Sequence, residues 1–98
     1  MLFRSFRRVF GDRIAQLPVT SLKSMIGHCL GAAGAIEAAA LALSIARGVI
    51  PPTINHESAD CDVLVVANQP REQRLRAGVS TSLGFGGNDA ALVIRACV

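Results

Sequence analysis

Lys23 and His28 are the side chains of this sequence best suited to charge and proton chemistry, and they lie five residues apart. Lys23 is the only lysine, because the other nine of the ten basic residues are arginines. Lysine carries a compact ammonium and histidine titrates near neutral pH, whereas arginine keeps its charge under ordinary conditions. These residue types at this spacing predict a specific chemical role for residues 23–28.

Glu37 is the only acidic residue in the alanine-rich stretch over residues 30–46. A lone carboxylate on a buried helix is costly unless it is paired or hydrogen-bonded. If the helix folds back against the preceding turn, Lys23 can supply the partner. The pair could belong to an active site or could simply fix the turn, and the residue types leave both interpretations open.

His28 is expected at or just before the start of that helix, where partial positive charge disfavours an imidazolium. A neutral imidazole offers one N–H donor, which can polarise a thioester or ketone oxygen and stabilise an enolate. Gly27 and Gly31 would allow another molecule to approach closely. A histidine that only caps or satisfies the local structure is the alternative.

Cys29 follows His28 and raises the possibility of a cysteine–histidine nucleophile. Neighbouring side chains on a helix point about 100° apart and rarely hydrogen-bond each other, so we expect Cys29 to be a packing residue. The other two cysteines, Cys61 and Cys97, add no metal-ligand or disulfide spacing. Cysteine usage therefore predicts a reducing cytoplasm and no metal site.

Gly84, Gly86 and Gly87 surround Phe85 in a connection between two expected strands. The run is too short for either phosphate-binding loop pattern. Its glycines permit positive φ or close approach of a ligand, which would place Phe85 on a hinge. A plain hairpin connection is the alternative.

Hydrophobic periodicity predicts the elements that must position these residues. They are a helix over 2–11, a strand over 17–21, a turn over 23–28, a helix over 29–47, and strands over 63–66, 77–83 and 90–97. Small residues lie on nearly every side of the helix over 29–47, which predicts a helix buried all round.

The composition resembles that of a protein core. Of the 98 residues, 51% are hydrophobic and only 4% aromatic, which indicates a piece of something larger. The net charge of +3 is modest, and the basic start lacks the apolar segment of a signal peptide. Residues 30–50 form a stretch long and apolar enough to suggest a membrane-spanning helix. Glu37, Arg47 and the alanine content favour a buried helix of a soluble protein instead.

Four motifs in order resemble the C-terminal part of the β-ketoacyl-acyl carrier protein synthases, condensing enzymes of the thiolase-like superfamily. The motifs are Lys23-Ser24-Met25-Ile26-Gly27-His28, Leu30-Gly31-Ala32-Ala33-Gly34-Ala35-Ile36-Glu37, Pro51-Pro52-Thr53-Ile54-Asn55 and Gly84-Phe85-Gly86-Gly87. The resemblance covers nearly the whole chain, and the first two motifs together are highly specific. It implies an α/β fold, namely the C-terminal part of a thiolase-like αβαβα sandwich with a mixed sheet, a buried alanine-rich helix and the N-terminal half absent.

The resemblance also implies an acyltransferase that elongates acyl chains by decarboxylative condensation with malonyl-carrier protein in fatty acid or polyketide synthesis. In that family a cysteine takes the acyl group and two histidines polarise the malonyl thioester, the second of which His28 matches. Lys23 matches the lysine that orders the site and pairs with a glutamate, here Glu37. Phe85 matches a gating phenylalanine, although Leu83 and the pair Asn88-Asp89 depart from the family's loop pattern.

The partners implied are an acyl carrier protein, the N-terminal ketosynthase half and a second copy, since the family is usually homodimeric. The resemblance implies no cofactor, no nucleic acid, no membrane span and a cytoplasmic location. The family's nucleophilic cysteine and first histidine fall in segments that this sequence does not contain, so the chain alone is expected to be inactive. A non-catalytic fragment, or a partner subunit like a chain-length factor, is the alternative.

Overall fold

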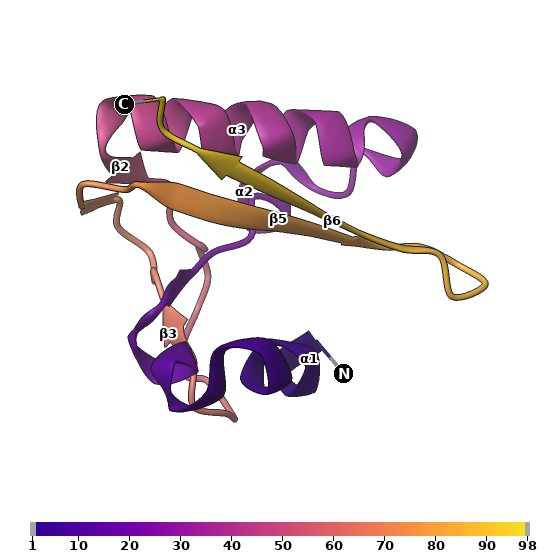
Figure 1. The fold of residues 1–98 in the computed structure, drawn as a ribbon, viewed down its shortest axis with the longest axis horizontal. Coiled ribbons are helices and arrows are strands. Elements are labelled where there is room, and N and C mark those ends of the chain that lie inside the picture. The colour runs from indigo at the N-terminus through magenta and orange to yellow at the C-terminus, as the bar shows by residue number, and fades with distance from the viewer. Residues whose placement is uncertain (1, 98) are drawn as a thin grey trace.

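Helix α3 (Ala33–Arg47) lies along one face of a hairpin made by strands β5 (Ala77–Leu83) and β6 (Asp89–Arg95) in the computed structural model, which describes residues 2–97 (Figure 1). The two strands are antiparallel and pair from Ala77 opposite Arg95 to Leu83 opposite Asp89. Gly78 of β5 lies so close to Leu41 of α3 that a β-carbon at residue 78 would overlap the leucine side chain. This glycine therefore lets the helix pack directly on the strand.

The start of α3 differs from the helix expected over 29–47. Leu30 has a φ of 50°, in the left-handed region that a right-handed α-helix does not include. Residues Leu30–Ala32 form a 3-10 turn, η2, and the α-helix begins only at Ala33. At the other end Gly48 takes the left-handed conformation, with φ 66°, and its N–H donates to the carbonyl of Ser44.

Helix α3 is not buried within this chain, contrary to the expectation for 29–47. Ser44 is its only buried residue, while Ile36 and Leu43 are 37% and 52% exposed. The reason is that the hairpin covers only one face of the helix, and the opposite face has no neighbouring element among residues 2–97 (Figure 1). By length and composition alone, the stretch Leu30–Arg47 could cross a membrane, with a mean hydropathy of 1.4.

The remaining elements are short. They are α1 (Leu2–Phe10), the 3-10 helix η1 (Gly11–Gln16), β1 (Pro18–Val19), α2 (Lys23–Ile26), β2 (Val49–Ile50), β3 (Leu64–Val65) and β4 (Arg71–Glu72). The strands expected over 17–21 and 63–66 are thus two residues each, and the strand expected over 90–97 runs from Asp89 to Arg95. The turn expected over 23–28 contains one turn of α-helix, α2.

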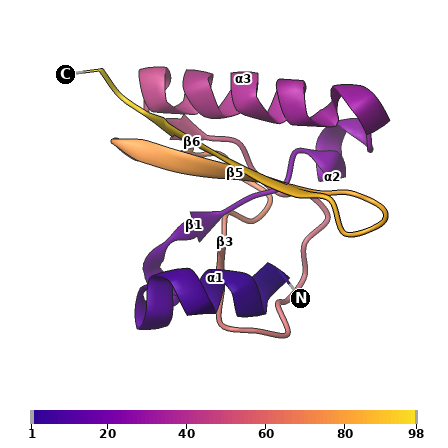
Figure 2. The ribbon, with the colours of Figure 1, turned by 45° about the vertical axis from the view of Figure 1, so that its right-hand side comes forward.

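Strand pairing in the described residues takes the form of three separate pairs instead of one mixed sheet. β1 and β3 are parallel, whereas β2–β4 and β5–β6 are antiparallel. Figure 2 shows α1 next to β1 and β3, at the opposite end of the molecule from α3. Among the described residues, the buried hydrophobic residues are Ile14, Ile50 and Val66. The chain therefore has a very small core of its own.

Candidate functional site

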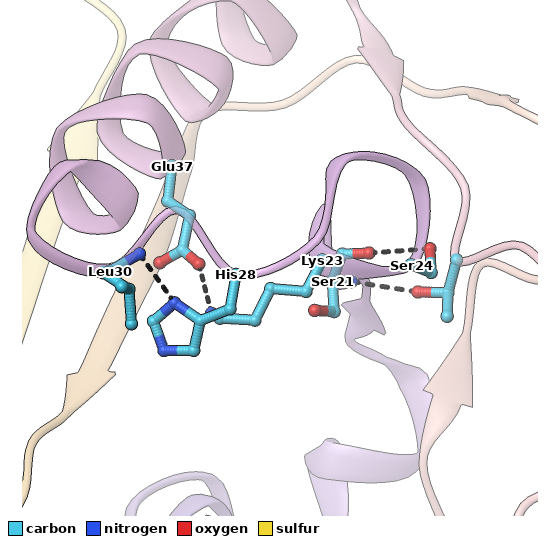
Figure 3. Close-up of polar contacts among 7 residues, drawn as sticks. Ser21, Lys23, Ser24, His28, Leu30 and Glu37 are labelled. Atoms are coloured by element: carbon cyan, nitrogen blue, oxygen red, sulfur yellow. Dashed lines mark hydrogen bonds and ion pairs between the residues drawn. The ribbon is translucent and has the colours of Figure 1, made fainter.

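Lys23 and Glu37 form an ion pair between α2 and α3. The Nζ atom of Lys23 lies 2.6 Å from Oε1 of Glu37, which makes this a short charge-assisted hydrogen bond (Figure 3). The lysine side chain is 41% exposed and the glutamate 18%. The pair is thus open on the lysine side, where its positive charge can act on a neighbouring group.

His28 accepts a hydrogen bond instead of donating one at Nδ1. The backbone N–H of Leu30 donates to His28 Nδ1 at 2.9 Å. A nitrogen that accepts carries no hydrogen, so this bond assigns the neutral tautomer with its hydrogen on Nε2. An imidazolium has hydrogens on both nitrogens and could not accept the bond.

The backbone on both sides of His28 is bent into the left-handed region. Gly27 has a φ of 74° with ψ −175°, a combination that only glycine adopts readily. Leu30 has a φ of 50°, which costs a leucine about 1–2 kcal/mol. The hydrogen bond from Leu30 N–H to the imidazole helps to offset this cost. This bond restricts the orientation of the exposed imidazole ring.

The side chains of Lys23, His28 and Glu37 gather at one side of the turn that leads into α3 (Figure 3). Chemically, this arrangement provides one neutral N–H donor on the exposed His28 and one ammonium held by a carboxylate. Such groups stabilise negative charge that develops on an oxygen placed between them. They do not include a nucleophile.

The glycine-rich connection closes the β5–β6 hairpin away from these groups. The N–H of Gly84 donates to Asn88 O at 2.6 Å, and Gly86 and Gly87 have φ of 80° and 82°. Phe85 is fully exposed, so its ring packs against none of the described residues. The structure therefore does not bring Phe85 together with Lys23, His28 and Glu37, and the hairpin tip projects beyond α3 (Figure 1).

The three cysteines are free, and the described residues contain no cluster of potential metal ligands. Cys29 is half-buried and directly precedes the 3-10 turn η2. Partial burial raises the pKa of the Cys61 thiol, and the charge of Asp60 raises it further. Such a thiol is a poor nucleophile near neutral pH.

Ser24 and Thr53 contribute to the site, although their residue types and spacing did not predict a chemical role for either. Ser24 Oγ donates to the carbonyl of Ser21 at 3.1 Å and accepts the N–H of Ile54 at 2.9 Å. Thr53 Oγ1 accepts the N–H of Ser21 at 2.9 Å. Both residues lie within the recognised motifs, which was the only sign in the sequence that they matter.

Comparison with known proteins relates the chain to ketosynthases. Residues 3–57 match the family described as beta-ketoacyl synthase, C-terminal domain. The chain is 51% identical over 92 residues to the tetracenomycin polyketide synthase ketoacyl synthase alpha subunit of Streptomyces glaucescens, and these cover 92% of this chain and 22% of that protein. It is 45% identical over 93 residues to 3-oxoacyl-[acyl-carrier-protein] synthase 2 of Coxiella burnetii, covering 93% of this chain and 22% of that protein.

Two solved structures match as well. One is a type II polyketide synthase acyl-carrier protein in complex with its ketosynthase, AntDE:AntF, with 38% identity and a TM-score of 0.91 over 96% of this chain and 24% of that chain. The other is the ishigamide ketosynthase/chain length factor, with 42% identity and a TM-score of 0.78 over 81% of this chain and 20% of that chain.

The fold and the turn at Lys23 and His28 therefore belong to the ketosynthase class of proteins. Within that class, the chain belongs to the beta-ketoacyl synthase family and corresponds to its C-terminal domain. It spans about a fifth of the length of the curated relatives it matches.

Proposed function

We propose that the chain is the C-terminal part of a 3-oxoacyl-acyl carrier protein synthase. The enzyme elongates acyl chains by decarboxylative Claisen condensation with malonyl-carrier protein, in fatty acid or polyketide synthesis. The observation that carries this proposal is the hydrogen bond that His28 Nδ1 accepts from Leu30 N–H, which leaves Nε2 as the donor, beside the Lys23–Glu37 ion pair (Figure 3). Relatives with ketosynthase activity in their names match more than nine-tenths of the chain, including this turn.

His28 acts in the decarboxylation step of this proposal. Its Nε2–H donates to the thioester oxygen of the malonyl group while the bond from C2 to the carboxylate breaks and CO₂ leaves. The electron pair of that bond becomes an enolate, whose oxygen gains negative charge that the donor stabilises. The enolate carbon then attacks the acyl thioester, and the thiolate of the enzyme's cysteine leaves.

Lys23 stabilises the same negative charge through its ammonium, and Glu37 holds that ammonium in place. Phe85, with Gly84, Gly86 and Gly87, forms a gate that opens and closes access to the cysteine. The exposed ring and the positive φ of Gly86 and Gly87 support a mobile gate, because none of residues 2–97 packs against the ring.

The nucleophilic cysteine and a second histidine belong, in this proposal, to the N-terminal half of the enzyme. That half completes the αβαβα sandwich, extends the strand pairs into a mixed sheet and covers the open face of α3. The assembled enzyme is a cytoplasmic homodimer that receives its acyl and malonyl groups from an acyl carrier protein. The stretch Leu30–Arg47 then packs in protein instead of lipid, and partitioning of the enzyme into membranes would contradict this point.

A hybrid ketosynthase tests the proposal. In it, this chain replaces the matching segment of the tetracenomycin relative, with which it shares 51% identity. We expect the hybrid to load an acyl group, to decarboxylate malonyl-carrier protein and to condense the two. Purified hybrid that loads acyl groups but produces neither CO₂ nor product would contradict the proposal and would favour a non-catalytic role like that of a chain-length factor.

The His28→Ala variant of the hybrid tests the assigned role. We expect malonyl decarboxylation to fall by about a hundredfold or more, as when one donor of this kind is removed, while acyl loading persists. His56→Ala is the matched control, because the structure gives His56 hydrogen bonds only through its backbone N–H and carbonyl. Equal loss of loading and decarboxylation in His28→Ala would indicate a structural histidine instead.

A further inference from the structure

We propose that Thr53 and Ser24 are positioning residues that hold the Lys23 turn against residues 51–55, and that this hydrogen-bonded clasp keeps the lysine in reach of Glu37. The clasp consists of the side chains of Thr20, Ser24 and Thr53 and the contacts they make. Its consequence for catalysis rests on the proposed function, whereas the contacts themselves do not.

Helix α2 has little else to hold it. It is four residues long, none of them is buried, and no side chain caps its N-terminus. Met25 and Ile26 are 41% and 53% exposed. A single helical turn is unstable on its own, because it fixes several backbone torsions for very few hydrogen bonds. Lys23 begins this turn, so its position depends on contacts from elsewhere.

Ser24 ties the turn to the Pro51–Asn55 motif. Its hydroxyl uses its one hydrogen on the Ser21 carbonyl, 3.1 Å away, and accepts the N–H of Ile54 at 2.9 Å. It thereby bridges segments 30 residues apart in sequence. Alanine here would leave the partly buried Ile54 N–H without this acceptor, which is more costly than the loss of an ordinary exposed hydrogen bond.

Thr53 makes the second tie, and counting hydrogens assigns its direction. Thr20 Oγ1 donates its one hydrogen to the Pro51 carbonyl at 2.7 Å. In the 3.2 Å contact between the two threonine hydroxyls, Thr53 must therefore be the donor. Its oxygen also accepts the N–H of Ser21 at 2.9 Å. The clasp is a directed chain of hydrogen bonds in which each hydroxyl has a distinct role.

The anchor of the clasp is firmer than the turn that it holds. The Thr53 N–H donates to the carbonyl of Val66 at 2.7 Å, and the Thr53 carbonyl accepts from Asn68 N–H at 2.8 Å. Val66 is 4% exposed and Pro52 is buried. Thr53 is therefore held by the small core, and the clasp transfers that order to the Lys23 turn. The ion pair to Glu37 then ties the other side of the turn to α3.

Lysine acetylation in the hybrid ketosynthase tests the clasp directly. The rate of acetylation at Lys23 is followed by peptide mass spectrometry in Ser24→Ala and in Thr53→Val. A lysine released from its ion pair reacts faster, and we expect an increase of about two- to fivefold, the range that a partly exposed pair allows. Glu37→Gln sets the upper limit, and Thr53→Ser, which keeps the hydroxyl, should restore the slow rate.

Two controls separate positioning from general loss of stability. Ser58→Ala removes an exposed hydroxyl outside the clasp and should leave the rate unchanged. Gly11→Ala puts a β-carbon on a residue with φ 58°, where nothing lies within 4 Å, and lowers stability through backbone strain without a contact to the clasp. An equal increase in Gly11→Ala would overturn the proposal, as would unchanged rates in both clasp variants.

Kinetics then link the clasp to the reaction. We expect Ser24→Ala and Thr53→Val to lower kcat for condensation and to leave KM for malonyl-carrier protein unchanged. The variant in which Lys23 is acetylated faster should have the lower kcat. An inactive unsubstituted hybrid would refute the proposed function, while the acetylation rates would still decide whether the clasp positions Lys23.

Discussion

Separated from the rest of a ketosynthase, this chain should not fold cooperatively, and the structure supplies the magnitude. Its accessible surface is 7362 Å². A folded monomer of 10.3 kDa exposes about 5,400 Å², so the chain carries an excess of about 2,000 Å². That excess equals one side of a large obligate interface.

The excess includes large apolar side chains that a folded monomer would cover. Leu43 on α3 is 52% exposed and Val93 on β6 is 67% exposed. At about 25 cal/mol per Å², apolar burial of even half the excess corresponds to about 25 kcal/mol before entropy costs. This is larger than the whole stability of an ordinary domain, about 5–15 kcal/mol. The missing contacts therefore decide whether the chain folds.

Calorimetry, dye binding and sedimentation of the purified chain check this reasoning. We expect no sharp thermal transition, strong binding of a dye that reports exposed apolar surface, and self-association. The hybrid ketosynthase should melt cooperatively. A monomeric chain would refute the reasoning if it bound no dye and unfolded in one transition with an enthalpy of about 70 kcal/mol, as a normal domain of this length does.

Three further predictions concern single residues. Gly78→Ala in the hybrid should lower the free energy of unfolding by about 1–3 kcal/mol, because the new methyl group meets Leu41, and thermal unfolding measures it. Gly34→Ala on α3, where an added β-carbon would lie 3.5 Å from Ser82 Oγ, should leave the free energy of unfolding unchanged or raise it. A larger loss of stability in Gly34→Ala than in Gly78→Ala would contradict the packing described. Phe85→Ala should leave the free energy of unfolding within about 0.5 kcal/mol, since the ring is fully exposed, but should change the rate of acyl loading; unchanged loading would contradict the gate. Cys61 should be alkylated slowly near neutral pH and faster as the pH rises, because partial burial and the charge of Asp60 raise the pKa of its thiol. Asp60→Asn should speed the alkylation, and an unchanged rate would contradict the effect assigned to Asp60.

The sequence predicts well those features that depend on neighbouring residues. Arg47 and Gly48 marked the end of a helix, and in the structure Gly48 takes the left-handed conformation there. The same reasoning failed at the start of α3. Leucine rarely takes the left-handed conformation, so its residue type does not predict the φ of 50° at Leu30. That conformation depends on a hydrogen bond from Leu30 N–H to the His28 side chain, which the sequence pattern does not reveal.

Features that depend on distant segments could not be predicted from local patterns. The clasp joins Thr20 and Thr53, which are 33 residues apart, and single hydroxyl residues at that separation carry no periodic signal. The burial expected for α3 followed from its composition. Composition indicates what a helix tends to contact but not whether the contacting segment lies in the same chain.

The left-handed Leu30 limits how this turn can change through evolution. Glycine at residue 30 would remove a steric cost of about 1–2 kcal/mol, and it would add an entropic cost of about 0.5–1 kcal/mol by giving the unfolded chain more freedom. It would also widen the range of orientations available to the imidazole. Selection for stability alone would therefore favour glycine slightly at this position, while selection for a narrowly oriented donor would retain a residue with a side chain there.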